Sequence, residues 1–261
     1  MRNSLFDEKL NTSLKSFLFL IFGVILMALF CMNMITIKAA TVDDRIEHFI
    51  YQDPKPEKVV YLTFDDGPSK YTLDLLNLLD KEDISAIFFV IGENIDLLSN
   101  ADEVLNEVLK RGHYIGLHSM THNMDKLYNV SGAPQNFVNE MLEVKGKIKE
   151  LTGFESNLCR PPYGGKTHFK EGHYRALEEA GLECVDWNVD SLDWAKSSAD
   201  AIFNQVIADL KHSNYPNEVV LLFHEKELTL EVLPRVIEYY RNQGYVFMPY
   251  YEGEEFDCMK K

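Results

Sequence analysis

Short apolar runs alternate with longer amphipathic segments from Lys58 almost to the end of the chain. The short runs are rich in β-branched residues, which is typical of buried strands, whereas apolar residues in the longer segments recur with the spacing of one helix face. Several of the longer segments end at a glycine, as helices commonly do. The pattern predicts strands at about 59–65, 86–91, 114–118, 158–161, 183–189, 219–224 and 245–249, and helices at about 71–81, 95–111, 135–151, 168–181, 199–212 and 229–243.

Strands and helices that alternate in this way form parallel βα units. A doubly wound open sheet and a closed barrel both satisfy the order, and periodicity does not choose between them. In either architecture the carboxyl ends of the strands meet on one face, where binding and catalytic groups lie. Polar residues that could do chemistry end or follow these strands, namely Asp65 and Asp66 at the first, His118 at the third, Arg160 at the fourth, Asp190 and Asp193 at the fifth and His224 at the sixth.

The N-terminal segment differs from the rest of the chain. Residues 17–37 form a run of 21 residues without a charge, and three basic residues precede it. A run of that length predicts a transmembrane anchor with its basic end inside the cell. A cleaved signal peptide is the alternative, but the run is long for one, and Lys38 stands before Ala40 where a small residue is expected. The predicted parts are a cytosolic tail with the anchor or signal segment at 1–40, a stalk at 41–57, the main domain at 58–252 and a C-terminal tail at 253–261.

Composition narrows the class of partner. The chain has 261 residues, 46% of them apolar, which suffices for a large domain with a sizeable core. Its formal net charge of −15 argues against a nucleic-acid partner, because no cluster of basic residues offsets the repulsion of phosphates. Cys31 lies in the apolar run, and Cys159, Cys184 and Cys258 show no metal-binding spacing. A Cys159–Cys184 disulfide and buried free thiols both remain open, and we favour the thiols.

Two histidines and two aspartates suggest a metal site. In "HSMTH", His118 and His122 stand four positions apart and could bind one ion if the chain turns helically after the strand. A pair of polar loop residues is the alternative. In "TFDDGPS", Asp65 and Asp66 end an apolar strand. A turn with a helix cap is the alternative interpretation, but such a turn needs only one of the two aspartates. Because adjacent strand residues point opposite ways, we expect one aspartate to complete a His, His, Asp site while the other stays off the metal.

Three further segments carry candidate site residues. "CRPPYGG" fixes an unusual backbone path that could aim a main-chain N–H at a substrate oxygen, and its Arg160 could keep a carboxylate ionised. A rigid surface turn is the alternative. "VVLLFHE" places His224 at a strand end, where many histidines only satisfy a carbonyl. "VDSLDW" offers Asp190 or Asp193 to orient that imidazole and Trp194 as an aromatic wall, unless it is a polar loop whose tryptophan covers the core.

In chain order, "TFDDGPS", "HSMTH", "RPPYG", "DSLDW" and "LFH" resemble the five motifs of the polysaccharide deacetylases, carbohydrate esterase family four with its NodB homology domain. The resemblance covers about residues 58–250, and "ISAIFFVIGENI" is similar to the family's second strand. It implies an α/β fold, a distorted (β/α) barrel of seven to eight parallel strands. Glu225 departs from the pattern, because many members carry an aspartate after the histidine.

The first three motifs supply the expected metal centre and base. By resemblance, Asp65 corresponds to the general base, and Arg160 to the residue that holds it. Asp66, His118 and His122 correspond to the ligands of a divalent metal ion. Zn²⁺ is expected, and Co²⁺, Ni²⁺, Fe²⁺ or Mn²⁺ are alternatives, because a His, His, Asp set accepts several metals.

The remaining motif residues correspond to groups that stabilise and enclose the reacting amide. Tyr163 matches the residue whose backbone N–H helps to bind the oxyanion. His224 matches the catalytic acid and Asp193 the carboxylate that tunes it. Trp194 and Leu222 match the walls of the acetyl pocket.

The resemblance implies a metal-dependent hydrolase that removes acetyl groups from N-acetylated amino sugars of a cell-wall polysaccharide. Peptidoglycan is the expected substrate, with N-acetylglucosamine and N-acetylmuramic acid both open, and chitin-like oligomers or O-acetyl esters are alternatives. A non-catalytic sugar-binding domain would lack one of the site residues, and all are present. The apolar N-terminal run places the domain outside the cytosol, membrane-anchored or secreted, and we expect a monomer.

Overall fold

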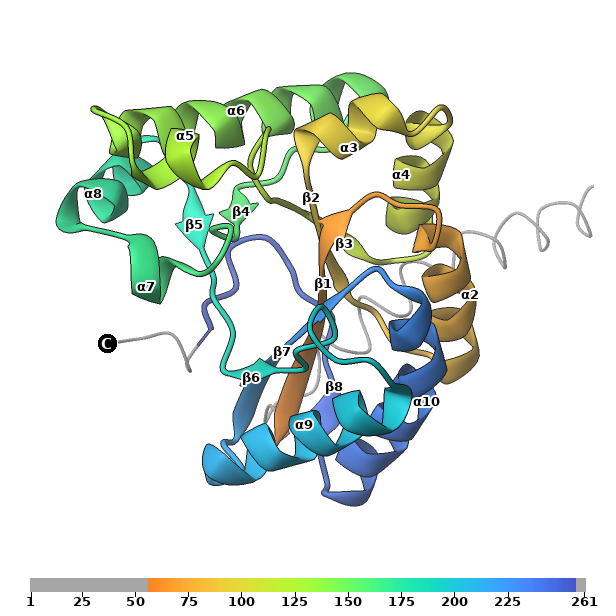
Figure 1. Cartoon of the computed structure of the whole chain (residues 1–261). Helices are drawn as coiled ribbons and strands as arrows, with labels where there is room; N and C mark the ends of the chain where they lie inside the picture. The colour runs from red at the N-terminus through yellow and green to blue at the C-terminus, as the bar shows by residue number, and fades with distance from the viewer. Residues whose placement is uncertain (1–55, 257–261) are drawn as a thin grey trace, which may run out of the picture. The chain divides into compact units, whose positions relative to one another are not determined.

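The first strand, β1, lies between β2 and β7 in a sheet in which every described pairing is parallel (Figure 1). The structure is a computed structural model that describes residues 56–256. Seven strands follow the order β5-β4-β3-β2-β1-β7-β6, and β8 pairs with β1. The strands are β1 (Val59–Gly67), β2 (Ile87–Val90), β3 (Tyr114–Leu117), β4 (Leu158–Cys159), β5 (Glu183–Cys184), β6 (Val189–Asp190), β7 (Glu218–His224) and β8 (Val246–Phe247).

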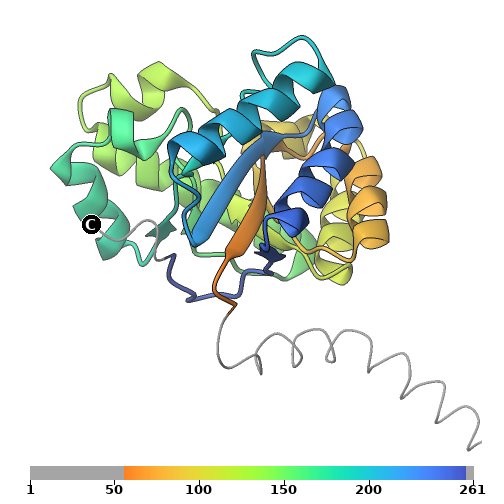
Figure 2. The same ribbon diagram turned by 90° about the horizontal axis from the view of Figure 1, so that it is seen from below.

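The helices lie outside this sheet (Figure 1). Figure 2 shows β1 and β7 side by side, with α9 and α10 packed outside them. The helices are α2 (Thr72–Glu82), α3 (Gly92–Leu97), α4 (Ala101–Lys110), α5 (Met124–Tyr128), α6 (Ala133–Thr152), α7 (Gly165–His168), α8 (Glu171–Glu179), α9 (Ala199–His212) and α10 (Glu227–Asn242). The parallel strands curl into a half-barrel, which confirms the prediction of a distorted (β/α) barrel.

The predicted strand at 183–189 is wrong in one respect, because it is two strands with no helix between them. β5 pairs with β4 and β6 with β7, at opposite ends of the sheet. The connecting backbone is engaged by Arg160, whose guanidinium donates to the carbonyl oxygens of Val185 and Asp186 at 3.3 and 3.2 Å. These carbonyls therefore serve a buried side chain instead of a neighbouring strand.

Two other elements differ from the pattern. The predicted helix at 95–111 is interrupted, since Leu98 has an extended backbone and α4 starts at Ala101. Ser99 and Asn100 in this gap are residue types whose side chains compete with helical hydrogen bonds. The short helix α5, which follows the second histidine, was not predicted from periodicity, because five residues are too few to show it.

The alternation of side chains along β1 separates the core from the site. Val60, Leu62 and Phe64 belong to the hydrophobic cluster that the helices cover. Thr63 and Asp65, on the other face, contact Arg160. The strand thus packs one face with apolar side chains and presents polar groups at its carboxyl end on the other.

Some sequence predictions fall outside the described residues. The apolar run at 17–37 and most of the stalk at 41–57 are among them, and no helix within residues 56–256 is long and apolar enough to cross a membrane. The predicted tail at 253–261 starts within the described part, where Phe256 stacks on Tyr250 at 5.3 Å between ring centroids. Cys159 and Cys184 are free thiols, as favoured from the sequence.

Candidate active site

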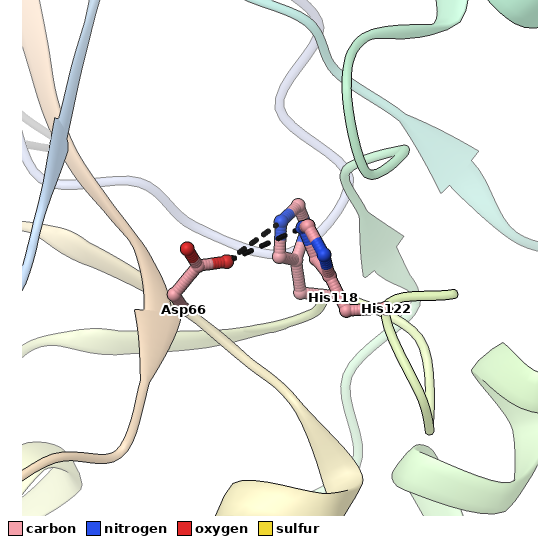
Figure 3. Close-up of side chains that lie close together, drawn as sticks. All are labelled: Asp66, His118 and His122. Carbon is pink, nitrogen blue, oxygen red and sulfur yellow. Dashed lines mark ion pairs between the residues drawn. The ribbon is translucent and has the colours of Figure 1, made fainter. Parts of the chain in front are cut away.

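Asp66, His118 and His122 place three metal-binding atoms together at the carboxyl ends of β1 and β3 (Figure 3). Asp66 Oδ1 lies 3.5 Å from His118 Nε2 and 3.4 Å from His122 Nε2. Ligand atoms that each lie about 2.0–2.1 Å from a tetrahedral zinc ion are separated from one another by roughly 3.3–3.4 Å. The observed separations therefore fit one divalent ion bound by all three side chains.

The hydrogen bonding of these side chains also fits a cation. Asp66 Oδ1 is buried and has no hydrogen-bond partner. His118 donates its Nδ1–H to the carbonyl oxygen of Arg160 at 2.8 Å, which leaves the lone pair on Nε2 facing the site. Burial lowers the pKa of His122, which favours the neutral imidazole that a metal ligand requires.

Asp66 departs from the geometry of a regular strand. Its φ of 65° is left-handed, and the pairing of β1 with β2 shifts register between Phe64 and Gly67. Strand alternation predicts that the two aspartates point in opposite directions. Because of this irregular backbone, they do not. Asp65 Oδ2 and Asp66 Oδ1 both approach His118 Nε2, at 3.7 and 3.5 Å.

The chain between the two histidines is a loop and not a helical turn, yet both imidazoles still reach Asp66. Ser119 and His122 have φ values of 64° and 50°. Left-handed backbone costs about 1–2 kcal/mol for each non-glycine residue, so other contacts must hold it. The Ser119 hydroxyl accepts the His122 N–H at 2.9 Å, and the Tyr163 hydroxyl donates to the His122 carbonyl at 2.9 Å.

Asp65 is paired with a buried arginine. Arg160 Nη1 donates to Asp65 Oδ1 at 2.9 Å and to the Thr63 hydroxyl at 2.7 Å. The guanidinium also lies 4.2 Å from the centre of the Phe89 ring. These contacts hold Asp65 Oδ1, while Oδ2 lies 3.7 Å from His118 Nε2 at the metal cluster.

His224 ends β7 with its Nε2 3.9 Å from Asp66 Oδ2. Asp193, rather than Asp190, orients it, because Asp193 Oδ1 lies 2.7 Å from His224 Nδ1 and Oδ2 accepts the His224 backbone N–H at 2.7 Å. Thr229 donates to the same Oδ2 at 2.6 Å. Burial works to lower the pKa of His224, but the hydrogen bond and charge of Asp193, with the charges of Asp65 and Asp66, raise it to about 9. The raised pKa favours the protonated form of His224.

The residues expected to contact substrate differ in exposure. Tyr163 has a left-handed φ of 64° and a side chain that is 45% exposed, and its ring lies 4.6 Å from that of His122. Trp194 is 60% exposed, whereas Leu222 is buried in β7. Tyr163 thus lies at the metal centre, and Trp194 offers an open aromatic surface next in sequence to Asp193.

Sequence reasoning missed several residues that support the site. Asn94 donates to the Asp66 carbonyl at 2.8 Å. Glu225 is buried and accepts from the Ser69 hydroxyl at 2.7 Å, tying the loop after the aspartates to β7. Glu140 of α6 accepts the backbone N–H of Thr121, the residue before His122. Glu140 had a signal in the sequence, because an acidic residue among the apolar positions of an amphipathic helix needs a buried partner.

Comparisons with known proteins agree with the motifs. The family model for polysaccharide deacetylases matches residues 52–185. The chain is 38% identical over 205 residues to a peptidoglycan-N-acetylglucosamine deacetylase of Bacillus cereus, covering 77% of this chain and 72% of the relative. The crystal structure of a polysaccharide deacetylase from Bacillus cereus gives a TM-score of 0.68 at 38% identity, covering 76% of this chain and 95% of that one. A Streptococcus mutans CE4 esterase gives 0.69 at 27% identity, covering 79% and 90%.

The family resemblance read from the five motifs is therefore confirmed by a family model, by a curated relative and by solved structures. The chain belongs to the polysaccharide deacetylase family of hydrolases.

Proposed function

We propose that the protein is a metal-dependent N-deacetylase of peptidoglycan that releases acetate from N-acetylglucosamine units. The observation that carries the proposal is that the Asp66, His118 and His122 cluster lies close to both a candidate base and a candidate acid. Asp65, held by Arg160, has its Oδ2 3.7 Å from His118 Nε2, and His224, held by Asp193, has its Nε2 3.9 Å from Asp66 Oδ2. A base and an acid beside a Lewis-acid site are what amide hydrolysis needs.

Asp66, His118 and His122 would hold the cation. When bound, a divalent ion supplies a Lewis acid that polarises the acetamide carbonyl and lowers the pKa of a water molecule. Zn²⁺ suits two imidazoles and one carboxylate. Asp65 Oδ2 accepts the proton from the attacking water, while Arg160 keeps Asp65 Oδ1 in place.

The remaining steps involve Tyr163, His224 and the two residues expected to line the acetyl pocket. The backbone N–H of Tyr163 donates to the oxygen that becomes negative as water adds to the carbonyl carbon. His224 then gives its Nε2 proton to the leaving nitrogen as the carbon–nitrogen bond breaks, and acetate and a free amine result. Trp194 and Leu222 enclose the acetyl methyl group.

The choice of substrate is supported by the curated relative, which is named for peptidoglycan N-acetylglucosamine. The test is acetate release by the purified domain from peptidoglycan, from chitin oligomers and from acetylated xylan, followed by mass analysis of digested muropeptides. We expect free amino groups on the glucosamine units of peptidoglycan. Release only from xylan would identify an O-acetyl esterase, and deacetylated muramic acid would change the target sugar.

Metal dependence is tested separately. Dialysis against a chelator should remove activity, and Zn²⁺ or Co²⁺ should restore it, because either ion suits the two imidazoles and one carboxylate of Asp66, His118 and His122. We also propose that the apolar run at 17–37 anchors the domain outside the cytosol. Cell fractionation should then find the intact chain with the membranes, whereas a mature N-terminus near Thr41 in the medium would show cleavage.

A further inference from the structure

Helix α6 contacts the loop that carries His122 through a buried carboxylate. Glu140 Oε2 accepts the backbone N–H of Thr121 at 2.9 Å, and the Thr121 hydroxyl lies 3.0 Å from both carboxylate oxygens. The next residue of the helix, Met141, accepts the N–H of Ser119 at 3.2 Å through its sulfur. Two consecutive residues of α6 therefore hold the segment between the two histidines.

This segment is one that local sequence does not stabilise. Ser119 and His122 both have left-handed φ values and neither is glycine, so the loop stays in this shape only where its surroundings determine it. Tyr163 fixes the carbonyl of His122 and Ser119 fixes its N–H. Glu140 fixes Thr121, the residue before His122, from α6.

Stabilisation of α6 alone does not explain the buried carboxylate of Glu140. The other buried residues of α6 include Phe137, Val138, Met141 and Val144, whereas Glu140 carries a carboxyl group and is only 7% exposed. Burying a carboxylate has a desolvation cost that an apolar side chain would avoid. Glu140 and Thr121 also line a hollow of about 470 Å³ on the protein surface. Water in this hollow would solvate Thr121 if the carboxylate were absent, so the solvation of Thr121 does not by itself require Glu140.

We propose that Glu140 is a positioning residue for the metal site: through Thr121 it holds the backbone on which the imidazole of His122 meets Asp66 and His118. The inference rests on the proposed metal-dependent function. It assigns to Glu140 an effect on metal affinity that is separate from any effect on folding.

The test compares zinc affinity, measured by competition with a chelator, in the wild type and four variants. Glu140→Ala should weaken zinc binding by about 10–100-fold, the range typical of residues that orient metal ligands. Glu140→Gln should remain close to wild type, because its amide oxygen still accepts the Thr121 N–H. Thr121→Ala removes the hydroxyl from the loop side and should give a smaller loss in the same direction, which keeps the test usable if Glu140→Ala does not fold.

The fourth variant separates positioning from stability. Val144→Ala removes buried apolar contacts from α6, so it should lower the unfolding temperature of the apo-protein while zinc affinity stays at the wild-type value. Equal zinc affinity in Glu140→Ala and wild type would overturn the inference, as would the same loss in Val144→Ala. If the wild type binds no zinc or other divalent ion, the proposed metal site itself fails.

Discussion

The carboxylate of Asp193 should determine the alkaline limit of activity. Its Oδ1 lies 2.7 Å from Nδ1 of His224, on the side of the ring opposite the metal centre, and its Oδ2 accepts the backbone N–H of the same residue. Asp193→Asn keeps the size of the side chain and removes its charge. Burial of the imidazole, which disfavours the protonated form, remains.

The size of the effect follows from the pKa of His224. At about 9, roughly nine in ten His224 side chains are protonated at pH 8. If the substitution returns the pKa to the ordinary 6.5, about three in a hundred are protonated at that pH. Because the acid must carry its proton, activity at pH 8 should fall about 30-fold, while at pH 6 the same change should cost less than about twofold.

The assay is kcat/KM for acetate release from pH 5.5 to 9.5 at saturating metal. A bound cation offsets the charge of Asp66, which contributes to the raised pKa of His224. The informative quantity is therefore the difference between variant and wild type in the pH at which activity declines, and not that pH itself. Asp190→Asn is the matched control, because Asp190 accepts the N–H of Leu192 and does not bond the imidazole. A loss in Asp193→Asn that is the same at every pH would refute the assignment of His224 as the acid tuned by Asp193.

Much of the fold could be predicted because most of the strands and the longer helices each show their own apolar period. The prediction of a single strand at 183–189 failed for a physical reason that the apolar pattern does not show. Whether a short apolar run continues as one strand depends on what its carbonyl groups meet, and here Arg160, which lies far away in sequence, bonds two of them. The same arginine therefore both holds Asp65 and interrupts the sheet.

The candidate site could be predicted at the level of residues but not of backbone. Parallel strands bring their carboxyl ends together, so Asp66 and His118 were expected near one another. The left-handed conformations of Asp66, Ser119 and His122 were not, because residues other than glycine rarely adopt them and nothing in their local sequence requires them. Such positions are held by distant side chains, as Asn94 holds the Asp66 carbonyl.

The remaining predictions concern three carboxylates, Glu225, Asp65 and Asp66. Glu225→Ala leaves two hydroxyl groups without their acceptor and should destabilise the protein by about 1–3 kcal/mol, a fall in unfolding temperature of roughly 2–12 °C, while the exposed Glu227→Ala should not. An unchanged unfolding temperature would mean that Glu225 does not hold the loop. Asp65→Asn should retain the metal, because its amide oxygen can still accept from Arg160, yet activity should fall about 10²–10⁴-fold, since an amide cannot accept the water's proton. Asp66→Asn should instead lose metal affinity, and excess metal should recover part of its activity. Metal content and acetate release, both measured at several metal concentrations, distinguish the two variants. If added metal rescues Asp65→Asn while Asp66→Asn holds metal and stays inactive, the two roles are reversed.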